Sequence, residues 1–198
     1  PFGFNAILQD YIRIYRSPYL SAAGLGWVCY AGCFVAVLTL MPSFLPESAR
    51  DFVVGAMPLA GIAASMTLGV FLLRKLPAIK VVLAGFGLSI LLAFVLWSLP
   101  GQAWTYLLFA AGLGLIQGSS FALVPQLNTT PASQALANGA MAQMGNLGNT
   151  LGTPALAAIV ATAGYSGMIL LALIVFAAGA LLHLWMAYRR RSLFVPHF

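Results

Sequence analysis

Charged residues are scarce in this sequence. Of its 198 residues, only 6% are Asp, Glu, Lys or Arg and 62% are hydrophobic, and the mean hydropathy is +0.97. A soluble domain carries about a quarter charged residues, so the composition predicts an integral membrane protein. The net charge of +6 does not indicate nucleic-acid binding, because the nine basic residues lie between apolar runs and form no patch.

Side chains that could hold a metal ion or a cofactor are equally few. The two cysteines, Cys29 and Cys33, lie four residues apart in an apolar run, with no histidine or carboxylate beside them. Neighbouring turns of one helix give poor geometry for a disulfide bond, so we expect both thiols to be reduced, buried and inert. The sequence therefore predicts no metal and no organic cofactor.

Ionisable side chains are also missing from the interior of the apolar runs. No Asp, Glu, Lys or Arg lies deep in any of them. Intramembrane carboxylates are the usual carriers of proton coupling, so a proton-coupled mechanism would need a group outside this sequence. His183, near the end of the last run, is interpreted as an interfacial residue or one hydrogen-bonded to a neighbour.

Six long apolar runs are present, and they comprise residues 19–41, 52–73, 81–99, 103–124, 137–163 and 165–188. Each has 19 residues or more. At about 1.5 Å per residue, each can cross a hydrocarbon core of about 30 Å. The sequence thus predicts an all-α bundle of six transmembrane helices in one domain, residues 19–188. A juxtamembrane segment, residues 1–18, precedes this domain, and a tail, residues 189–198, follows it.

The basic residues predict the orientation of the chain. With six spans, eight of the nine fall on one side, and these are Arg13, Arg16, Arg74, Lys75, Lys80, Arg189, Arg190 and Arg191. Only Arg50 falls on the other side, next to Asp51. Because basic residues favour the cytoplasmic side, we expect both ends of the chain in the cytoplasm. Residues 1–17 mix apolar and basic side chains, which is typical of a short helix lying at the membrane surface.

One face of the fifth run is polar. Gln143, Asn146, Thr150 and Thr153 recur every three or four residues, and Asn138 and Asn149 lie near them. An unpaired polar group in hydrocarbon costs several kcal/mol, so lipid cannot cover this face. We expect the face to look into a protein interior or a water-filled cavity.

Small residues in the fourth and fifth runs indicate close helix packing. Gly114 and Gly118 form a GxxxG pair, and Gly145, Gly148 and Gly152 recur along the fifth run. Glycine lets the backbones of two membrane helices approach each other closely. These five residues are therefore predicted helix-packing positions.

Polar and aromatic residues of the first and fourth runs each have two interpretations. Gln117 is either hydrogen-bonded to a neighbouring helix or a polar contact in a substrate cavity. Trp27, Tyr30 and Phe34 form a stripe at helical spacing, which packs against other helices or offers a platform for an amphipathic ligand.

Three segments resemble the C-terminal six-helix half of a major facilitator superfamily transporter. Residues 127–139, LNTTPASQALANG, resemble the cytoplasmic loop of that half, and residues 145–154, GNLGNTLGTP, resemble its glycine-rich penultimate helix. Residues 69–75, GVFLLRK, resemble a degenerate copy of the short basic loop motif, without its acidic residue. Gln134 stands where the loop often has arginine.

This resemblance implies a secondary transporter that works by alternating access. The family's first, second, fourth and fifth helices border the central cavity. The implied substrate-cavity residues are Trp27, Tyr30, Gln117, Gln143, Asn146 and Asn149. The resemblance also implies a missing N-terminal half as partner, a bacterial plasma membrane and no enzymatic activity. The amide, hydroxyl and aromatic groups suit a small neutral, zwitterionic or amphipathic solute.

Two other classes of protein share features with this sequence. A non-transporting membrane subunit that packs against partner proteins is compatible with the sparse polar content. An intramembrane serine protease would need Ser119 or Ser120 to pair with His183, but Phe121 replaces the glycine that should follow the serine. Aquaporins and mitochondrial carriers are excluded because their signature motifs are missing.

Overall fold

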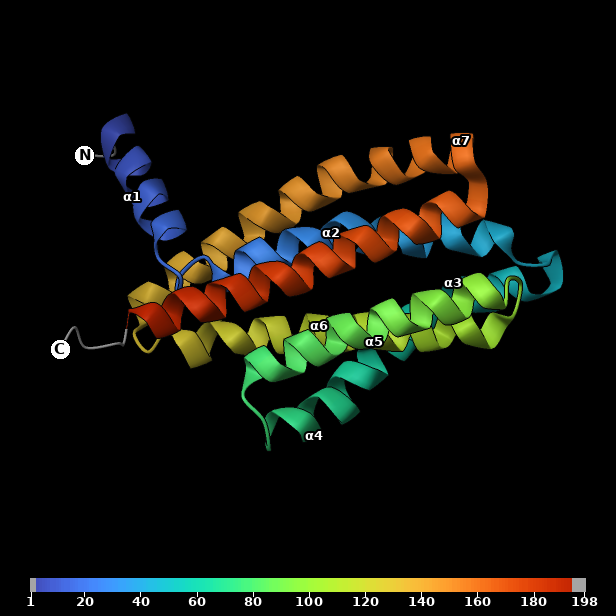
Figure 1. Cartoon of the computed structure of the whole chain (residues 1–198), viewed down its shortest axis with the longest axis horizontal. Helices are drawn as coiled ribbons and strands as arrows, with labels where there is room; N and C mark the ends of the chain where they lie inside the picture. Colours follow the sequence, from blue (N-terminus) through green and yellow to red (C-terminus); the bar gives the residue numbers. More distant parts are fainter. Residues whose placement is uncertain (1–2, 194–198) are drawn as a thin grey trace.

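Long helices run side by side in the part of the chain that the structure describes, residues 3–193 (Figure 1). In this computed structural model, those residues form helices and connections, with no strand among them. Five helical segments within this range are long and apolar enough to cross a membrane, namely Ala22–Phe44, Glu47–Leu73, Ala78–Ser98, Ala103–Leu127 and Pro131–Ser192. The architecture is therefore all-helical and compatible with a multi-pass membrane bundle.

Two of these segments contain a change of helix type. Helix α2 (Ala22–Leu40) continues into the 3₁₀ turn η1 (Met41–Phe44). Helix α3 (Glu47–Ala64) continues through the π-helical turn η2 (Ser65–Gly69) into α4 (Val70–Leu73). The remaining helices are α1 (Phe4–Arg16), α5 (Ala78–Ser98), α6 (Ala103–Leu127) and α7 (Pro131–Ser192).

Helix α7 reverses its direction at Gly164. This residue has φ 61° and ψ −150°, which is not helical and is a conformation that only glycine adopts readily. Figure 1 shows the two arms of α7, residues 131–163 and 165–192, lying side by side on the two sides of this break. The break falls between the fifth and sixth apolar runs of the sequence.

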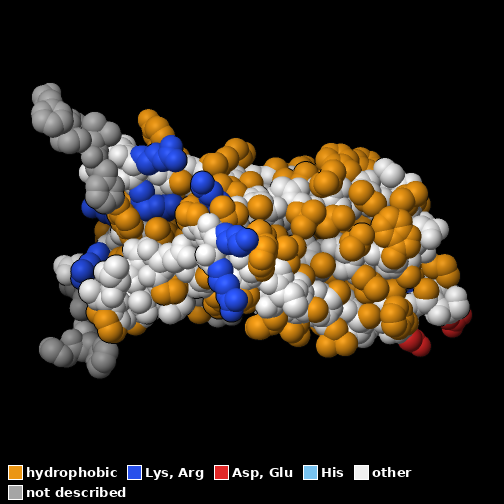
Figure 2. All heavy atoms as spheres, turned by 90° about the horizontal axis from the view of Figure 1, so that it is seen from below, with side chains coloured by type: hydrophobic (Ala, Val, Ile, Leu, Met, Phe, Trp, Pro, Cys, Tyr) orange, Lys and Arg blue, Asp and Glu red, His pale blue; other side chains and the backbone are white. Residues whose placement is uncertain are grey.

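Opposite charges lie at opposite ends of the bundle (Figure 2). Basic residues occupy the last turns of α1 and α7, including Arg16 and Arg190, and we call this the basic end. Glu47 in the first turn of α3 lies at the other end. Between the ends, the surface in Figure 2 is largely hydrophobic, as expected for a body surrounded by lipid.

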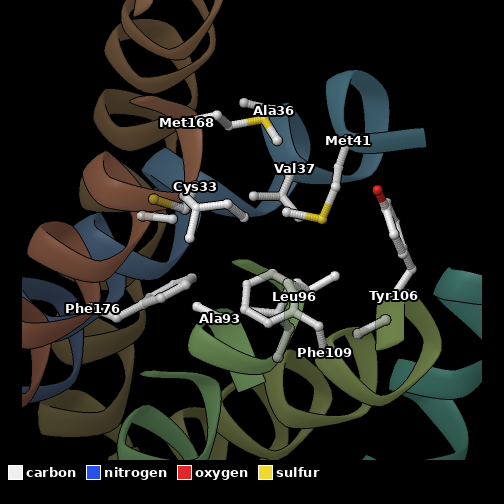
Figure 3. Close-up of a cluster of buried hydrophobic side chains, with 14 of the residues drawn as sticks. Cys33, Ala36, Val37, Met41, Ala93, Leu96, Tyr106, Phe109, Met168 and Phe176 are labelled. Carbon is white, nitrogen blue, oxygen red and sulfur yellow. The ribbon is translucent and has the colours of Figure 1, made fainter. Parts of the chain in front are cut away.

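The buried side chains form two clusters. The larger joins α2, α5, α6 and α7 through side chains such as Cys33, Phe109 and Phe176 (Figure 3). The smaller lies nearer the basic end and includes Ile14 of α1 and Met141 of α7. Both cysteines are free thiols, with Cys33 buried and Cys29 half-buried. Trp27 packs against both clusters and thus lies where they meet.

Side-chain amides organise the connections at the basic end. Gln126 Oε1 accepts a hydrogen bond from the Ala78 backbone N–H at 2.7 Å, and Gln134 Nε2 donates one to the Asn128 carbonyl at 2.9 Å. Thr130 and Ser133 form a capping box at the start of α7. These bonds satisfy backbone groups that helix ends leave without partners.

Glycines mark the closest approaches between helices. Gly114 of α6 lies against the backbone of Gly61 in α3, and Gly148 and Gly152 of α7 lie against the backbone of α2 near Gly32. Gly118 faces the Ser65 hydroxyl, and a Cβ at Gly145 would lie 2.7 Å from Trp27 Nε1. The backbones can approach this closely because a side chain is missing at each contact.

We predict that Gly114→Ala destabilises the bundle. The added methyl group would overlap the Gly61 carbonyl oxygen, and backbone atoms cannot move aside as a flexible side chain can. Overpacking of this kind costs about 2 kcal/mol, which corresponds to a fall of about 5 °C in the midpoint of thermal unfolding in detergent. The control is Gly87→Ala, because a Cβ there meets nothing within 4 Å. An equal midpoint for the two variants would contradict the prediction.

Candidate functional site

Three aromatic rings of α2 form a stack. The ring centroids of Trp27 and Tyr30 are 4.5 Å apart, and those of Tyr30 and Phe34 are 5.0 Å apart. The Tyr30 hydroxyl donates a hydrogen bond of 3.3 Å to Gln117 Oε1 on α6. Tyr30 is buried and Gln117 is half-buried. The aromatic stack is therefore hydrogen-bonded to the Gln117 amide, and this side chain remains partly exposed at the surface.

Two pockets share Phe121 in their walls. The Gln117 pocket, of about 360 Å³, is lined by Gln117 and Phe121 of α6 and by Ser65 and Met66 of η2. The Trp27 pocket, of about 280 Å³, lies between Trp27, Phe121 and the first arm of α7, where Asn138 lines it. The Phe121 ring centroid is 5.2 Å from that of Trp27. Phe121 lines both pockets and is half-exposed.

The π-helical turn η2 positions Ser65 and Met66 at the Gln117 pocket. A π-helical turn inserted into an α-helix changes which side chains share a face. Pro58, inside α3, removes one backbone donor a short distance before this turn. Gly118 of α6 has no side chain that would clash with the Ser65 hydroxyl. No sequence pattern marked the π-helical turn.

Gln143 lies outside both pockets and contacts α1. The Tyr15 hydroxyl donates to Gln143 Oε1 at 3.0 Å, and Gln143 Nε2 donates to the Tyr11 hydroxyl at 3.0 Å. Burial, and secondarily the neighbouring Tyr11, raise the pKa of Tyr15 above its usual value, so this phenol remains a donor at neutral pH. The structure thus pairs this predicted cavity residue with the amphipathic N-terminal helix.

Asn146 and Asn149 are exposed on the first arm of α7. Neither side chain makes a hydrogen bond to a residue whose side chain the structure describes. Asn138, which lines the Trp27 pocket, is on the same side of this arm, whereas Leu147 and Leu151 are exposed on another side. The polar face of the arm therefore begins at the Trp27 pocket and continues along its surface.

Phe121 and Asn138 contribute to the site, although they were not among the predicted cavity residues. Phe121 follows Gln117 by four residues, so the two share a helix face, and this spacing could have identified Phe121. Asn138 lies eight residues before Asn146, which also places it on the polar face. Helical periodicity alone was therefore sufficient to find both residues.

His183 is fully buried, which corrects its interpretation as an interfacial residue. Its imidazole fills the space left by Gly26 and lies 5.7 Å from the Phe86 ring, measured between ring centroids. Neither ring nitrogen has a hydrogen-bond partner among the described residues. The Ser119 hydroxyl donates to the Leu115 carbonyl at 2.6 Å, and the Ser120 hydroxyl has no hydrogen-bond partner among the described residues. Neither serine is therefore hydrogen-bonded to His183 there, as a serine protease would require.

Residues 3–193 contain no group of three histidine, cysteine or carboxylate side chains placed to hold a metal ion. The groups at the two pockets are amides, a hydroxyl and aromatic rings, which bind ligands by hydrogen bonding and stacking.

No protein-family model matches this sequence, and no curated protein is significantly similar to it.

We predict that replacing both Tyr11 and Tyr15 by Phe releases α1 from α7. Each hydroxyl makes one hydrogen bond to Gln143, worth roughly 0.5–1 kcal/mol at a partly exposed position. Trypsin should then cleave after Arg13 and Arg16 roughly tenfold faster, because the open state is more populated. Cleavage in the α4–α5 connection, after Lys75, is the internal reference, and Tyr188→Phe is the control variant. Unchanged cleavage of α1 would show that these bonds do not hold it.

Proposed function

We propose that this chain is half of a secondary transporter of the major facilitator type. In this proposal the chain crosses the membrane six times, because the arms of α7 count as two crossings, and both of its ends are cytoplasmic. Its polar face forms one wall of a central cavity that a second, N-terminal six-helix half completes. The transported solute is small and neutral, zwitterionic or amphipathic.

The main support for the proposal comes from the exposed side-chain amides on the first arm of α7. Asn146 and Asn149 lie well inside an apolar run of 27 residues, 137–163, and are exposed. Lipid offers an amide no hydrogen-bond partner, and an unpaired amide in hydrocarbon costs several kcal/mol. Water in a cavity, or another protein surface, is therefore needed on this side of the chain.

The pockets favour a cavity wall over a simple packing surface. Gln117 and Asn138 each present an amide to a pocket that an aromatic ring also lines. Ligand sites commonly combine apolar walls with a few polar groups that fix orientation. No charged residue lines either pocket, which argues against a multiply charged solute.

Alternating access requires helices that can shift against one another. The contacts at Gly114, Gly148 and Gly152 are backbone contacts without interlocking side chains, so they permit small sliding motions. In the proposed cycle Trp27 and Phe121 hold the apolar part of the solute while Gln117 orients its polar part. Rocking of the two halves then exposes this site to one side of the membrane at a time.

A non-transporting membrane subunit is the second candidate. The same exposed amides of Asn146 and Asn149 would then be covered by a partner protein and paired with its polar groups. The two candidates differ in whether water reaches the polar face, which can be measured without knowing the substrate.

Cysteine accessibility tests the proposal. Asn146→Cys and Asn149→Cys are compared with Leu147→Cys and Leu151→Cys, after Cys29 and Cys33 have been replaced by alanine. The complete protein in its native membrane is treated with a positively charged methanethiosulfonate reagent. We expect the two asparagine positions to react at least about tenfold faster, because only a hydrated thiol forms the reactive thiolate.

The leucine positions are matched controls, since they lie at similar depth and are also exposed on this arm. If all four cysteines stay unmodified, a dry partner covers the polar face and the subunit candidate replaces the transporter. If all four react equally, the arm is not surrounded by lipid and both candidates are wrong.

A further inference from the structure

The last turns of α1 and α7 bring four arginines to the basic end of the bundle. Arg189 Nη2 donates to the Arg16 carbonyl at 3.3 Å, and Arg190 Nη1 donates to the Pro18 carbonyl at 2.9 Å. Arg191 follows in the same last turn of α7. We call Arg16, Arg189, Arg190 and Arg191 the arginine corner. It joins segments more than 170 residues apart in the sequence.

The arginine corner holds more positive charge than its surroundings neutralise. The C-terminal ends of α1 and α7 supply roughly half a negative charge each, against four guanidinium groups. Among the side chains that the structure describes, none of these arginines forms an ion pair with a carboxylate. Glu47 and Asp51 lie at the opposite end of the bundle, and Asp10 lies on α1, six residues before Arg16. Even when the carboxylate of Asp10 is counted with the two helix ends, about two positive charges remain without a counter-charge among the described residues.

Apolar and aromatic groups surround the corner on the membrane side. Trp185 is 50% exposed, and the Arg189 guanidinium lies 5.2 Å from the centre of its ring. Tyr188, three residues after Trp185 in α7, is exposed, and Leu8 and Ile12 are exposed on α1. In Figure 1, α1 runs steeply across the direction of the long helices, as a helix at a membrane surface would. Exposed Trp and Tyr are typical of headgroup depth.

We propose that the arginine corner binds the phosphate of an anionic phospholipid. Guanidinium groups donate bidentate hydrogen bonds to phosphate oxygens, and Trp185 contacts the glycerol region and the upper part of the acyl chains. The exposed apolar side chains favour a lipid over free phosphate, because they match the apolar part of a lipid molecule. The proposal requires only that the chain lies in a membrane, and it is independent of transport.

The test compares two double variants that lose the same charge at the same end of the bundle. Arg16→Gln with Arg191→Gln changes two exposed members of the corner, while the buried Arg190 is left in place. Arg74→Gln with Lys80→Gln is the control, since both side chains are exposed in the α4–α5 region. Native mass spectrometry of the detergent-purified complete protein measures binding of phosphatidylglycerol, cardiolipin and phosphatidylcholine.

We expect wild type and the control to bind the two anionic lipids, and the corner variant to bind them on the order of twentyfold more weakly. Phosphatidylcholine should bind weakly to all three proteins. Equal losses in the two variants would show only a diffuse effect of surface charge and would overturn the site. Displacement of the lipid by millimolar inorganic phosphate would overturn the choice of a lipid as occupant.

Discussion

Hydrocarbon offers no hydrogen-bond partners, and this constraint governs most of the structure. Backbone groups are paired within helices, and several hydroxyl groups donate to a carbonyl one turn earlier in their own helix. Thr67 donates to Ala63 at 2.7 Å and Thr162 to Ala158 at 3.0 Å, so neither hydroxyl reaches lipid unpaired. The side-chain amides of Asn and Gln cannot form this short bond within their own helix as readily. They therefore need a hydrogen-bond partner from another helix or from outside the chain.

The amides of the bundle find their partners in different ways. Gln117 accepts from Tyr30 across a helix contact, and Gln143 is paired at both of its polar atoms with α1. Asn146 and Asn149 have no partner among the described residues. Since lipid cannot supply one, we expect the side of the bundle that carries Asn146 and Asn149 to face water or another protein.

The lengths of the apolar runs predicted the long helices because the membrane core sets a minimum length. Helix ends were less predictable: α7 begins at Pro131, six residues before its apolar run, because Thr130 and Ser133 cap it outside the core. The reversal at Gly164 followed from a glycine between two runs. The pairing of Gln143 with α1 could not be predicted, since it depends on how the N-terminal helix docks, and periodicity fixes only a face.

Trp27 links the packing of the bundle to the candidate site. Its indole lies over Gly145, where a Cβ would stand 2.7 Å from Nε1, and it contacts both buried clusters. A side chain at position 145 would overlap the indole, so its absence lets the indole pack against α7. Any sliding of the first arm of α7 along α2 would change this contact and, with it, the space beside Phe121. The glycine contact and the Trp27 pocket share the indole of Trp27, so a change at one of them alters the other.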